Sequence, residues 1–344
     1  MSALNSEFTG KRLLLAAKEA GAGALLAALA RSWRPAVGSV VIANPVAAPH
    51  FEKLPVRVFS DDMSDAEIDD LVISTMPDRI VIGASVGSTI EKRVLTSARK
   101  AALEVDTFID HYWNLWQRFA EPYTARPWQY MPCRIHVPAY ACAKRLASCG
   151  CPTGNVYVYD HPLLGQEATR REKRLGRKLR AAWAIPEEAV VVLFVSEYLF
   201  EPDPLWNWDQ PHAEDYTGLL SLLLKRSVVT NSELPVVVLV RTHPNEPHTR
   251  WDALCRSIPG SQWRNAAHIS KEELLSVANL AFGLNSMLLL EAASSGLPVY
   301  SHHTQISPRD SWLSSIRSEI IELPDERSIL MLFKSICQLT WARK

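Results

Sequence analysis

The stretch of sequence from residue 278 to residue 300 reads Ala-Asn-Leu-Ala-Phe-Gly-Leu-Asn-Ser-Met-Leu-Leu-Leu-Glu-Ala-Ala-Ser-Ser-Gly-Leu-Pro-Val-Tyr. It predicts a short buried strand, a polar turn at Asn285-Ser286, a helix that carries Glu291, a stop at Gly296 and a second strand. The free N–H groups at a helix start and the positive end of the helix dipole favour a phosphate, and Asn285 and Ser286 add short donors there. The alternative is that these two residues only cap the helix.

The segment Arg241-Thr-His-Pro-Asn-Glu246 follows a predicted strand upstream of this stretch. Held by Pro244, His243 can donate a hydrogen bond to a phosphate oxygen and stabilise the leaving nucleotide without a metal. The alternative is a loop histidine with structural hydrogen bonds only. Glu291 lies five residues into the predicted helix, where its carboxylate can reach ribose hydroxyls.

These motifs resemble those of known enzymes. The strand-turn-helix with Glu-Ala-x-x-x-Gly-x-Pro-Val from Glu291 resembles the donor-nucleotide site of GT-B glycosyltransferases and of the related UDP-N-acetylglucosamine 2-epimerases. The His243-Pro244 pair resembles the His-Pro element of GT-B enzymes that use CMP-activated sugars, sialyltransferase-like and Kdo-transferase-like, and of glycerophosphotransferase-like relatives. Residues 134–165 resemble the last unit of a GT-B N-terminal domain, in which Tyr159-Asp-His-Pro162 leads into the linker.

The resemblance implies an α/β fold with two Rossmann-like domains that face each other across a cleft. Residues 1–162 would form the acceptor side, and residues 163–344 would form the nucleotide-sugar donor side. A nucleotide sugar linked to CMP or UDP would serve as co-substrate, with no further cofactor. Its contacts would come from His243, Pro244, Asn285, Ser286, Met287, Glu291, Ser196, Glu197 and Arg241.

Composition sets the outer bounds. The chain has 344 residues, enough for two domains that each have a core. It is 47% apolar and 22% charged, as in folded soluble proteins, and its 37 cations balance 37 anions, which argues against a nucleic-acid partner. A cytoplasmic protein is expected, because no apolar run could span a membrane and the first residues lack a signal pattern. Reduced thiols and no metal site are expected, because Cys149-Gly-Cys151 has no second pair at zinc spacing.

Alternating strand and helix signals predict parallel sheets with helices between their strands. The first strand is expected at Arg12–Ala17, followed by a glycine turn at Lys18–Gly23 and a helix at Ala24–Arg31. A closing helix is expected at Ile329–Leu339. Further strands are predicted at residues 39–44, 56–60, 79–83, 107–110, 134–138, 156–160, 190–196 and 236–241, at His268, and at residues 280–282 and 299–301.

Two glycine-containing turns in the first half are candidate acceptor sites. Gly21 and Gly23 follow a strand and open a helix, so the backbone there can approach a sugar closely. Ser85 and Ser88 occupy the same position in a second strand-turn-helix pattern and are predicted to bind hydroxyls, while Glu91 is a candidate base. Simple helix capping is the alternative for this second turn.

An ionisable pair, Asp110-His111, follows another predicted strand and precedes a group of aromatic residues predicted to pack in the core. An inverting transferase needs a carboxylate or imidazole that accepts the proton of the acceptor hydroxyl. Asp110 is the first choice for this base, His111 the second and Glu91 the third.

Two further segments have open alternatives. In the loop after Ser196-Glu197, Trp206 and Trp208 either stack on a base or sugar or anchor the loop. The cation-rich helix Arg170–Arg180 either rests on an anionic membrane surface or is a solvated helix.

Together the motifs favour a cytoplasmic, metal-independent glycosyltransferase that transfers a sugar from a nucleotide-activated donor to a surface-glycan acceptor, free or lipid-linked, with peripheral contact at the inner face of the membrane. The alternatives are a nucleotide-sugar 2-epimerase or hydrolase on the same scaffold and a non-catalytic nucleotide-sugar-binding protein.

Overall fold

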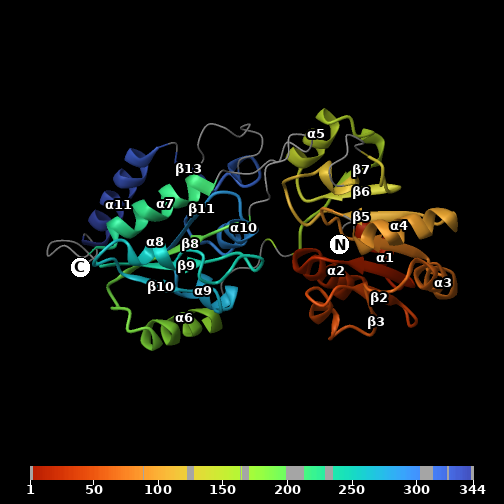
Figure 1. The fold of residues 1–344 in the computed structure, drawn as a ribbon, viewed down its shortest axis with the longest axis horizontal. Coiled ribbons are helices and arrows are strands. Elements are labelled where there is room, and N and C mark those ends of the chain that lie inside the picture. The colour runs from red at the N-terminus through yellow and green to blue at the C-terminus, as the bar shows by residue number, and fades with distance from the viewer. Residues whose placement is uncertain are drawn as a thin grey trace. The chain divides into compact units, whose positions relative to one another are not determined.

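The computed structural model divides the chain into two compact units (Figure 1). It describes residues 3–87, 89–121, 128–162, 164, 170–198, 213–228, 235–302, 313–323 and 325–341. The described residues from 3 to 162 belong to the first unit, and those from 164 to 341 belong to the second. Each unit is built on one parallel sheet, which confirms the predicted α/β class.

The first unit has a seven-stranded sheet in the order β3-β2-β1-β4-β5-β6-β7. Successive residues of β1 point to opposite faces, so Leu15 packs in the core with α2 while Leu14 packs in the core with α3 and α4. The strands are β1 (Leu13–Ala17), β2 (Val40–Ala43), β3 (Arg57–Ser60), β4 (Arg79–Ile82), β5 (Val105–Phe108), β6 (Arg134–Val137) and β7 (Val156–Val158). The helices are α1 (Ala3–Phe8), α2 (Ala20–Trp33), α3 (Asp65–Thr75), α4 (Ile90–Lys100) and α5 (Tyr140–Ser148), with 3-10 turns η1 (Ala48–Phe51), η2 (Gln117–Phe119) and η3 (Thr153–Asn155).

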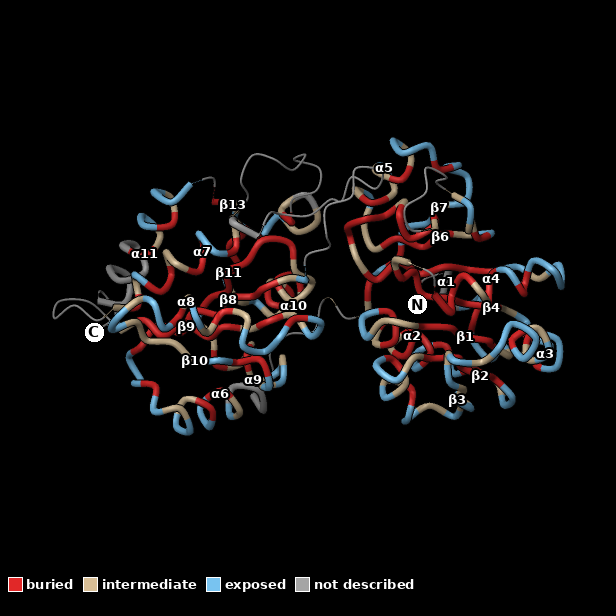
Figure 2. Tube along the Cα trace, viewed as in Figure 1, coloured by how far each residue is buried: buried red, intermediate tan, exposed pale blue. Residues whose placement is uncertain are grey.

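The second unit has a six-stranded sheet in the order β10-β9-β8-β11-β12-β13. Its central strand β8 is buried at every residue, as expected for a parallel strand covered on both faces (Figure 2). The strands are β8 (Val190–Val195), β9 (Val236–Arg241), β10 (Trp263–Asn265), β11 (Leu280–Gly283), β12 (Val299–Ser301) and β13 (Ile321–Glu322). The helices are α6 (Arg170–Ala182), α7 (Ala213–Arg226), α8 (Asp252–Arg256), α9 (Lys271–Val277), α10 (Met287–Ser294) and α11 (Glu326–Trp341), with the 3-10 turn η5 (Leu313–Ser315).

The predicted glycine turn at Lys18–Gly23 is wrong, because α2 already begins at Ala20 and contains both glycines. Their lack of a side chain allows close packing instead. A Cβ added at Gly21 would lie 2.4 Å from the Asp110 carboxylate, and one added at Gly23 would lie 2.9 Å from the Cβ of Ala47. The first turn of α2 can therefore pack tightly against two neighbouring loops.

The predicted strand at His268 is also wrong, because β10 ends at Asn265. The carbonyls that follow β10 are bound by a side chain from β9. Arg241 Nη1 donates to the carbonyl oxygen of Ala266 at 3.0 Å and to that of Ile269 at 2.8 Å. The chain therefore turns away from the sheet before His268.

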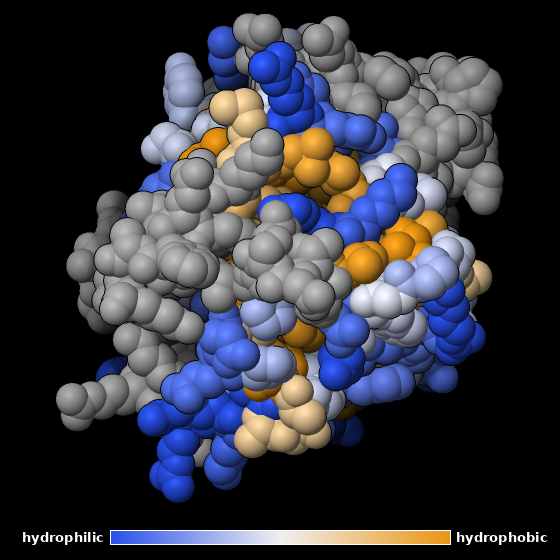
Figure 3. All heavy atoms as spheres, turned by 90° about the vertical axis from the view of Figure 1, so that its left-hand side faces the viewer, coloured by the Kyte–Doolittle hydropathy of each residue, from blue (hydrophilic) through white to orange (hydrophobic). Residues whose placement is uncertain are grey.

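Among the described residues, no helix combines the length and the apolar character needed to cross a bilayer. The cation-rich α6 packs against α9, and a Cβ added at Gly176 would lie only 2.2 Å from the carbonyl oxygen of Ser276. Arg174, Arg177 and Lys178 of α6 are exposed. Figure 3 shows hydrophilic side chains gathered at the lower edge of this face of the second unit, where α6 lies in Figure 1.

Candidate active site

The second unit brings together most of the residues predicted to bind a nucleotide sugar. Strands β9, β8 and β11 are neighbours in its sheet and run parallel. His243 lies beyond the carboxyl end of β9, Ser196 and Glu197 follow β8, and Asn285 and Ser286 lie beyond the end of β11. The carboxyl ends of parallel strands are where open α/β sheets bind their ligands.

His243 is held as a neutral hydrogen-bond donor. Its Nδ1 accepts a hydrogen bond from the backbone N–H of Asn245 at 3.1 Å, which leaves the ring proton on Nε2. Burial, and secondarily the charge of Arg241, lower the pKa of His243 to about 4. The sequence predicts a donor to phosphate at this position, and the structure supplies one that is uncharged in the free protein.

Glu246 positions the loop that carries His243, and sequence reasoning missed it. Its Oε2 accepts hydrogen bonds from the backbone N–H of His243 at 2.9 Å and from Ser196 Oγ at 2.8 Å, and its Oε1 pairs with Arg250. The side chain is almost fully buried. The hydroxyl of Ser196, predicted to contact the ligand, is therefore used to join the ends of β8 and β9.

Thr242 was also missed: its buried Oγ1 has no hydrogen-bond partner among the described residues.

Glu197 carries an unusual carboxyl group at the end of β8. Burial raises its pKa to about 7, although a hydrogen bond from the Tyr216 hydroxyl at 3.0 Å opposes the shift. The backbone of Asn285 hydrogen-bonds to the same hydroxyl, which links the ends of β8 and β11 through α7. A carboxyl group that is partly protonated at neutral pH can donate to a phosphate oxygen instead of repelling it.

The start of α10 has the geometry of a capped helix. Ser286 Oγ accepts a hydrogen bond from the N–H of Leu288 at 3.3 Å, so Ser286 caps the helix, and its O–H can still donate to a ligand. Met287 is the first residue of α10. Glu291 Oε2 lies 2.6 Å from Lys271 Nζ, so any contact with a ribose would share that carboxylate with an ion pair.

Two other predicted contacts lie at the same edge with different surroundings. Pro244 is exposed beside His243. The Arg241 side chain donates hydrogen bonds to the carbonyl oxygens that follow β10, and burial lowers the pKa of Arg241. Its main effect on this site is therefore to hold the loop after β10 and to keep His243 neutral.

The first unit gathers three carboxylates at the carboxyl ends of the neighbouring strands β1, β4 and β5. We call Glu19, Glu91 and Asp110 the acidic cluster. Glu19 is the N-cap residue of α2 after β1, Glu91 lies in the first turn of α4 after β4, and Asp110 follows β5. Asp110 and Glu91 both act on the pKa of Glu19. Two of these residues were predicted as candidate bases, and the fold brings them together.

Glu91 is buried, and one of its two carboxylate oxygens accepts hydrogen bonds from described residues. Its Oε1 accepts hydrogen bonds from the backbone N–H of Lys18 at 2.8 Å and from Ser85 Oγ at 2.7 Å, while Oε2 has no hydrogen-bond partner among the described residues. Ser85, predicted to bind an acceptor hydroxyl, is itself buried and orients Glu91. Ser88, predicted for the same role, lies outside the described residues.

Asp110 is buried beside the guanidinium group of Arg118. Arg118 Nη1 lies 3.6 Å from its Oδ1, and Arg118 also donates to the backbone carbonyls of Trp113 and Ala84. Burial raises the pKa of Asp110, and Arg118 opposes that shift. The other carboxylate oxygen faces Gly21 in the first turn of α2, where the helix dipole favours a negative charge.

Glu19 is the member of the cluster that sequence reasoning missed. It is half-buried, whereas Glu91 and Asp110 are buried. Burial raises its pKa from 4.5 to about 7, with Arg118 opposing and the other two carboxylates adding to the shift. A group that a ligand can reach and that titrates near neutral pH has the properties of a general base.

The remaining first-unit candidates lie beside the cluster. His111 is half-buried, and its Nδ1 accepts a hydrogen bond from the N–H of Trp113 at 3.3 Å. Of the four aromatic residues predicted to pack in the core, Tyr112, Trp113 and Phe119 are buried and Trp116 is half-buried. Within the described part of the chain, no group of three or more His, Cys, Asp or Glu side chains, the acidic cluster included, is arranged so that it could hold a metal ion.

No protein-family model matches the chain, and no curated protein matches its sequence. Among solved structures, Anabaena HepE in complex with UDP and glucose is similar at a TM-score of 0.62 and 10% identity, over 94% of this chain and 89% of that chain. UDP-GlcNAc 2-epimerase from Neisseria meningitidis, bound to UDP-GlcNAc, is similar at 0.57 and 15%, over 95% and 91%. The fold is of the GT-B type. MurG from Acinetobacter baumannii is a further similar structure, at 0.50 and 11% over 94% and 90%.

Proposed function

We propose that this chain is a metal-independent glycosyltransferase that moves a sugar from a UDP-linked donor to a hydroxyl of a glycan acceptor. The observation that carries the proposal is Glu19, a half-buried carboxyl at the end of β1 with a pKa of about 7. Glu19 accepts the proton of the acceptor hydroxyl as that oxygen attacks the anomeric carbon and the bond to the diphosphate breaks. Burial is the main cause of its raised pKa, and the charges of Asp110 and Glu91 add to that shift.

The second unit is proposed to bind the donor. His243 Nε2–H, the Ser286 hydroxyl and the protonated fraction of Glu197 offer donors at the ends of three adjacent strands. Such donors stabilise the charge that develops on the leaving diphosphate. Glu291 remains the proposed ribose contact. UDP is preferred over CMP because the similar proteins HepE and the Neisseria epimerase were solved with UDP or a UDP-sugar.

The test of function is product formation from a panel of UDP- and CMP-sugars with glycan acceptors. The proposal expects UDP release that depends on an acceptor and needs no added metal. Thermal shift with the free nucleotides gives the binding preference separately, because a ligand of the folded state raises its stability with concentration. Stronger stabilisation by CMP than by UDP would reverse the donor assignment.

His243→Ala is expected to weaken UDP binding by about 1.5–3 kcal/mol, or roughly 10- to 150-fold in Kd, because a hydrogen bond to a charged phosphate is lost. Isothermal titration of the full chain measures this directly. The matched control is His248→Ala, an exposed histidine in the same loop. Equal affinity of wild type and His243→Ala would remove His243 from the nucleotide site.

A nucleotide-sugar 2-epimerase is the second candidate, and the acidic cluster is the observation that favours it. Epimerisation needs several acid or base groups around one sugar ring, and Glu19, Glu91 and Asp110 are close enough to shift the pKa of one of them. NMR of UDP-GlcNAc incubated with the chain and no acceptor separates the two functions. A new 2-epimer without UDP release indicates the epimerase, whereas an unchanged donor supports the transferase.

The acceptor is proposed to be a surface glycan, free or lipid-linked. The exposed Arg174, Arg177 and Lys178 of α6 would suit contact with an anionic membrane face. We expect sedimentation with phosphatidylglycerol vesicles at low salt and its loss at high salt, because such contacts are screened. Binding to neutral vesicles alone would contradict this role for α6.

A further inference from the structure

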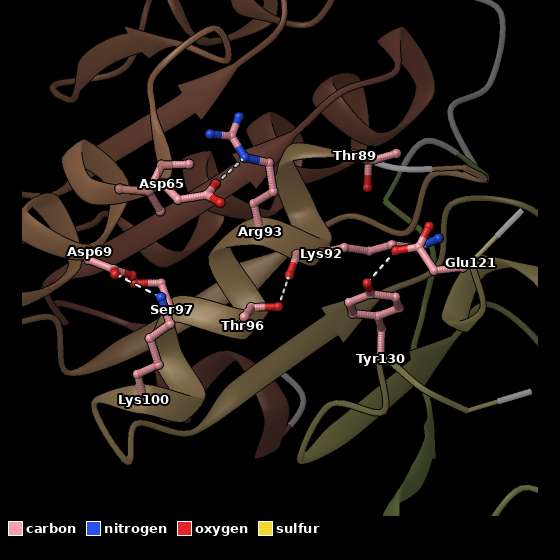
Figure 4. A pocket seen from close by; sticks show the side chains of 11 residues that line it. Asp65, Asp69, Thr89, Lys92, Arg93, Thr96, Ser97, Lys100, Glu121 and Tyr130 are labelled. Carbon is pink, nitrogen blue, oxygen red and sulfur yellow. Dashed lines mark hydrogen bonds and ion pairs between the residues drawn. The ribbon is translucent and has the colours of Figure 1, made fainter. Parts of the chain in front are cut away.

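The first unit contains a pocket of about 320 Å³ that no step of the proposed reaction uses. Its walls come from α3, from α4 and from the segments that hold Glu121 and Tyr130 (Figure 4). The volume lies at the lower end of the range for small-molecule sites, roughly 300–1,000 Å³. The pocket could therefore hold a ligand about as large as a single sugar ring.

The charges around the pocket balance. Three of its lining side chains are acidic and three are basic. Four of these side chains form two ion pairs. Arg93 Nε lies 2.7 Å from Asp65, and Lys100 Nζ lies 2.8 Å from Asp69. Figure 4 shows both pairs on one side of the pocket. Neither a nucleoside diphosphate nor a polyamine would meet a net opposite charge here.

Polar groups that can bind a ligand lie on the other side. Thr89 is 4% exposed, and its Oγ1 has no hydrogen-bond partner among the described residues. Lys92 is 5% exposed and donates to the carbonyl oxygen of Ala120, which leaves further N–H donors on its ammonium group. The Tyr130 hydroxyl donates to the Glu121 carboxylate, and Lys92 Nζ lies 5.3 Å from the centre of the Tyr130 ring.

A hydroxyl, an ammonium, a carboxylate and an aromatic ring around a charge-balanced pocket match the needs of a neutral sugar, whose hydroxyls both donate and accept. We propose that this pocket binds a neutral pyranose ring, with Thr89 and Lys92 as its deepest contacts. The assignment of this ring as a residue of the acceptor glycan rests on the proposed function.

The pocket adjoins the acidic cluster. Thr89, Lys92 and Tyr130 also line a small cavity of about 10 Å³, whose other walls include Glu91 and Arg118. Thr89 is the N-cap residue of α4, although its side chain makes no capping hydrogen bond, and Glu91 and Lys92 lie in the first turn. A sugar held at Thr89 and Lys92 therefore lies at the same turn of α4 as Glu91 of the cluster. This position suits an acceptor residue next to the sugar that reacts.

Titration of the full chain with methyl α-D-glucopyranoside, methyl α-D-galactopyranoside and methyl α-D-mannopyranoside tests binding, followed by saturation-transfer NMR. At least one of the three should bind, and saturating UDP should not displace it. Thr89→Val should weaken it about 2- to 10-fold and Lys92→Met about 10-fold or more, from the loss of one neutral and one charged hydrogen bond. The exposed residues changed in Thr249→Val and Lys11→Met are the matched controls.

Four results would overturn the site: no glycoside binds, UDP displaces the glycoside, both pocket variants retain wild-type affinity, or glucuronate and inorganic phosphate bind in preference to every neutral ring. The results that would reject the pyranose site differ from those that would reject the transferase function. Glycoside binding that depends on Thr89 in a chain that never binds UDP keeps the site and rejects the transferase. In an active transferase, Thr89→Val should raise the KM of the glycan acceptor and leave kcat unchanged, and a change confined to kcat would reject the acceptor role.

Discussion

Glu19→Gln is expected to lower transfer turnover by roughly 10²–10⁴-fold while the Kd for UDP stays at its wild-type value. The amide keeps the shape of the side chain but cannot accept the acceptor proton. Glu19 belongs to the first unit and the residues proposed to bind nucleotide belong to the second, so binding and turnover should separate. Steady-state transfer assays and UDP titration on the same preparation measure both quantities.

The pH dependence gives an independent check on Glu19. A base must be deprotonated, so the ratio of wild-type kcat/KM to that of Glu19→Gln should rise with pH through about 7. Taking the ratio cancels the opposing loss of the Glu197 proton over the same pH range. The raised pKa also means that the folded state loses stability as pH rises from 4.5 toward 7, because the folded state holds a proton that the unfolded state releases. Glu19→Gln should therefore melt at a higher temperature than wild type at pH 8.

Glu52→Gln, an exposed carboxylate in the same unit, is the control and should change neither quantity. Asp110→Asn and Glu91→Gln should affect the rate less than Glu19→Gln does, because both carboxylates are buried and engaged with Arg118, Lys18 or Ser85. Wild-type turnover in Glu19→Gln, with a large loss in Asp110→Asn, would return the base to the residue that the sequence favoured.

The elements that the sequence predicts best are those decided by local chemistry. The strand at Val236–Arg241 has the predicted bounds because five apolar residues, four of them valines, end at a charged residue. The start of α2 could not be predicted from local signals, because glycine is usually a turn residue. Gly21 belongs to the helix because Asp110, almost ninety positions later, packs where its side chain would be.

The candidate sites show the same division. Asp110 and Glu91 could be predicted because a charged residue after a buried strand, or at the start of the next helix, lies at the carboxyl edge of a sheet. Glu19 has the same signal, but the mistaken turn at its position hid it. Its pKa depends first on burial and then on Arg118 and Asp110, all of which only the fold determines. Glu246 was missed because its role is to accept hydrogen bonds from His243 and Ser196, a contact that spans two strands.

Arg118→Met is expected to destabilise the first unit by roughly 3–5 kcal/mol, since removing one partner of a buried ion pair leaves the other charge uncompensated. Both side chains are buried, with 6% of Arg118 and 11% of Asp110 exposed. Hydrogen exchange at the amides of β1, β4 and β5 measures the opening free energy of this unit alone. Arg79→Met, which removes a surface pair with Glu104, should cost less than about 1 kcal/mol.

The double variant Arg118→Met with Asp110→Asn should recover part of the loss, because it removes the unpaired charge as well as its partner. In the single variant, burial still raises the pKa of Asp110, and the cation that opposed the shift is gone. A carboxyl with a raised folded-state pKa gives stability at low pH that is lost as pH rises through that pKa, so the deficit of Arg118→Met should be larger at pH 8 than at pH 5. The loss of stability in Arg118→Met could instead be independent of pH and unchanged by adding Asp110→Asn. That result would show that Arg118 stabilises the unit through its hydrogen bonds to the carbonyls of Trp113 and Ala84, and not through its ion pair with Asp110.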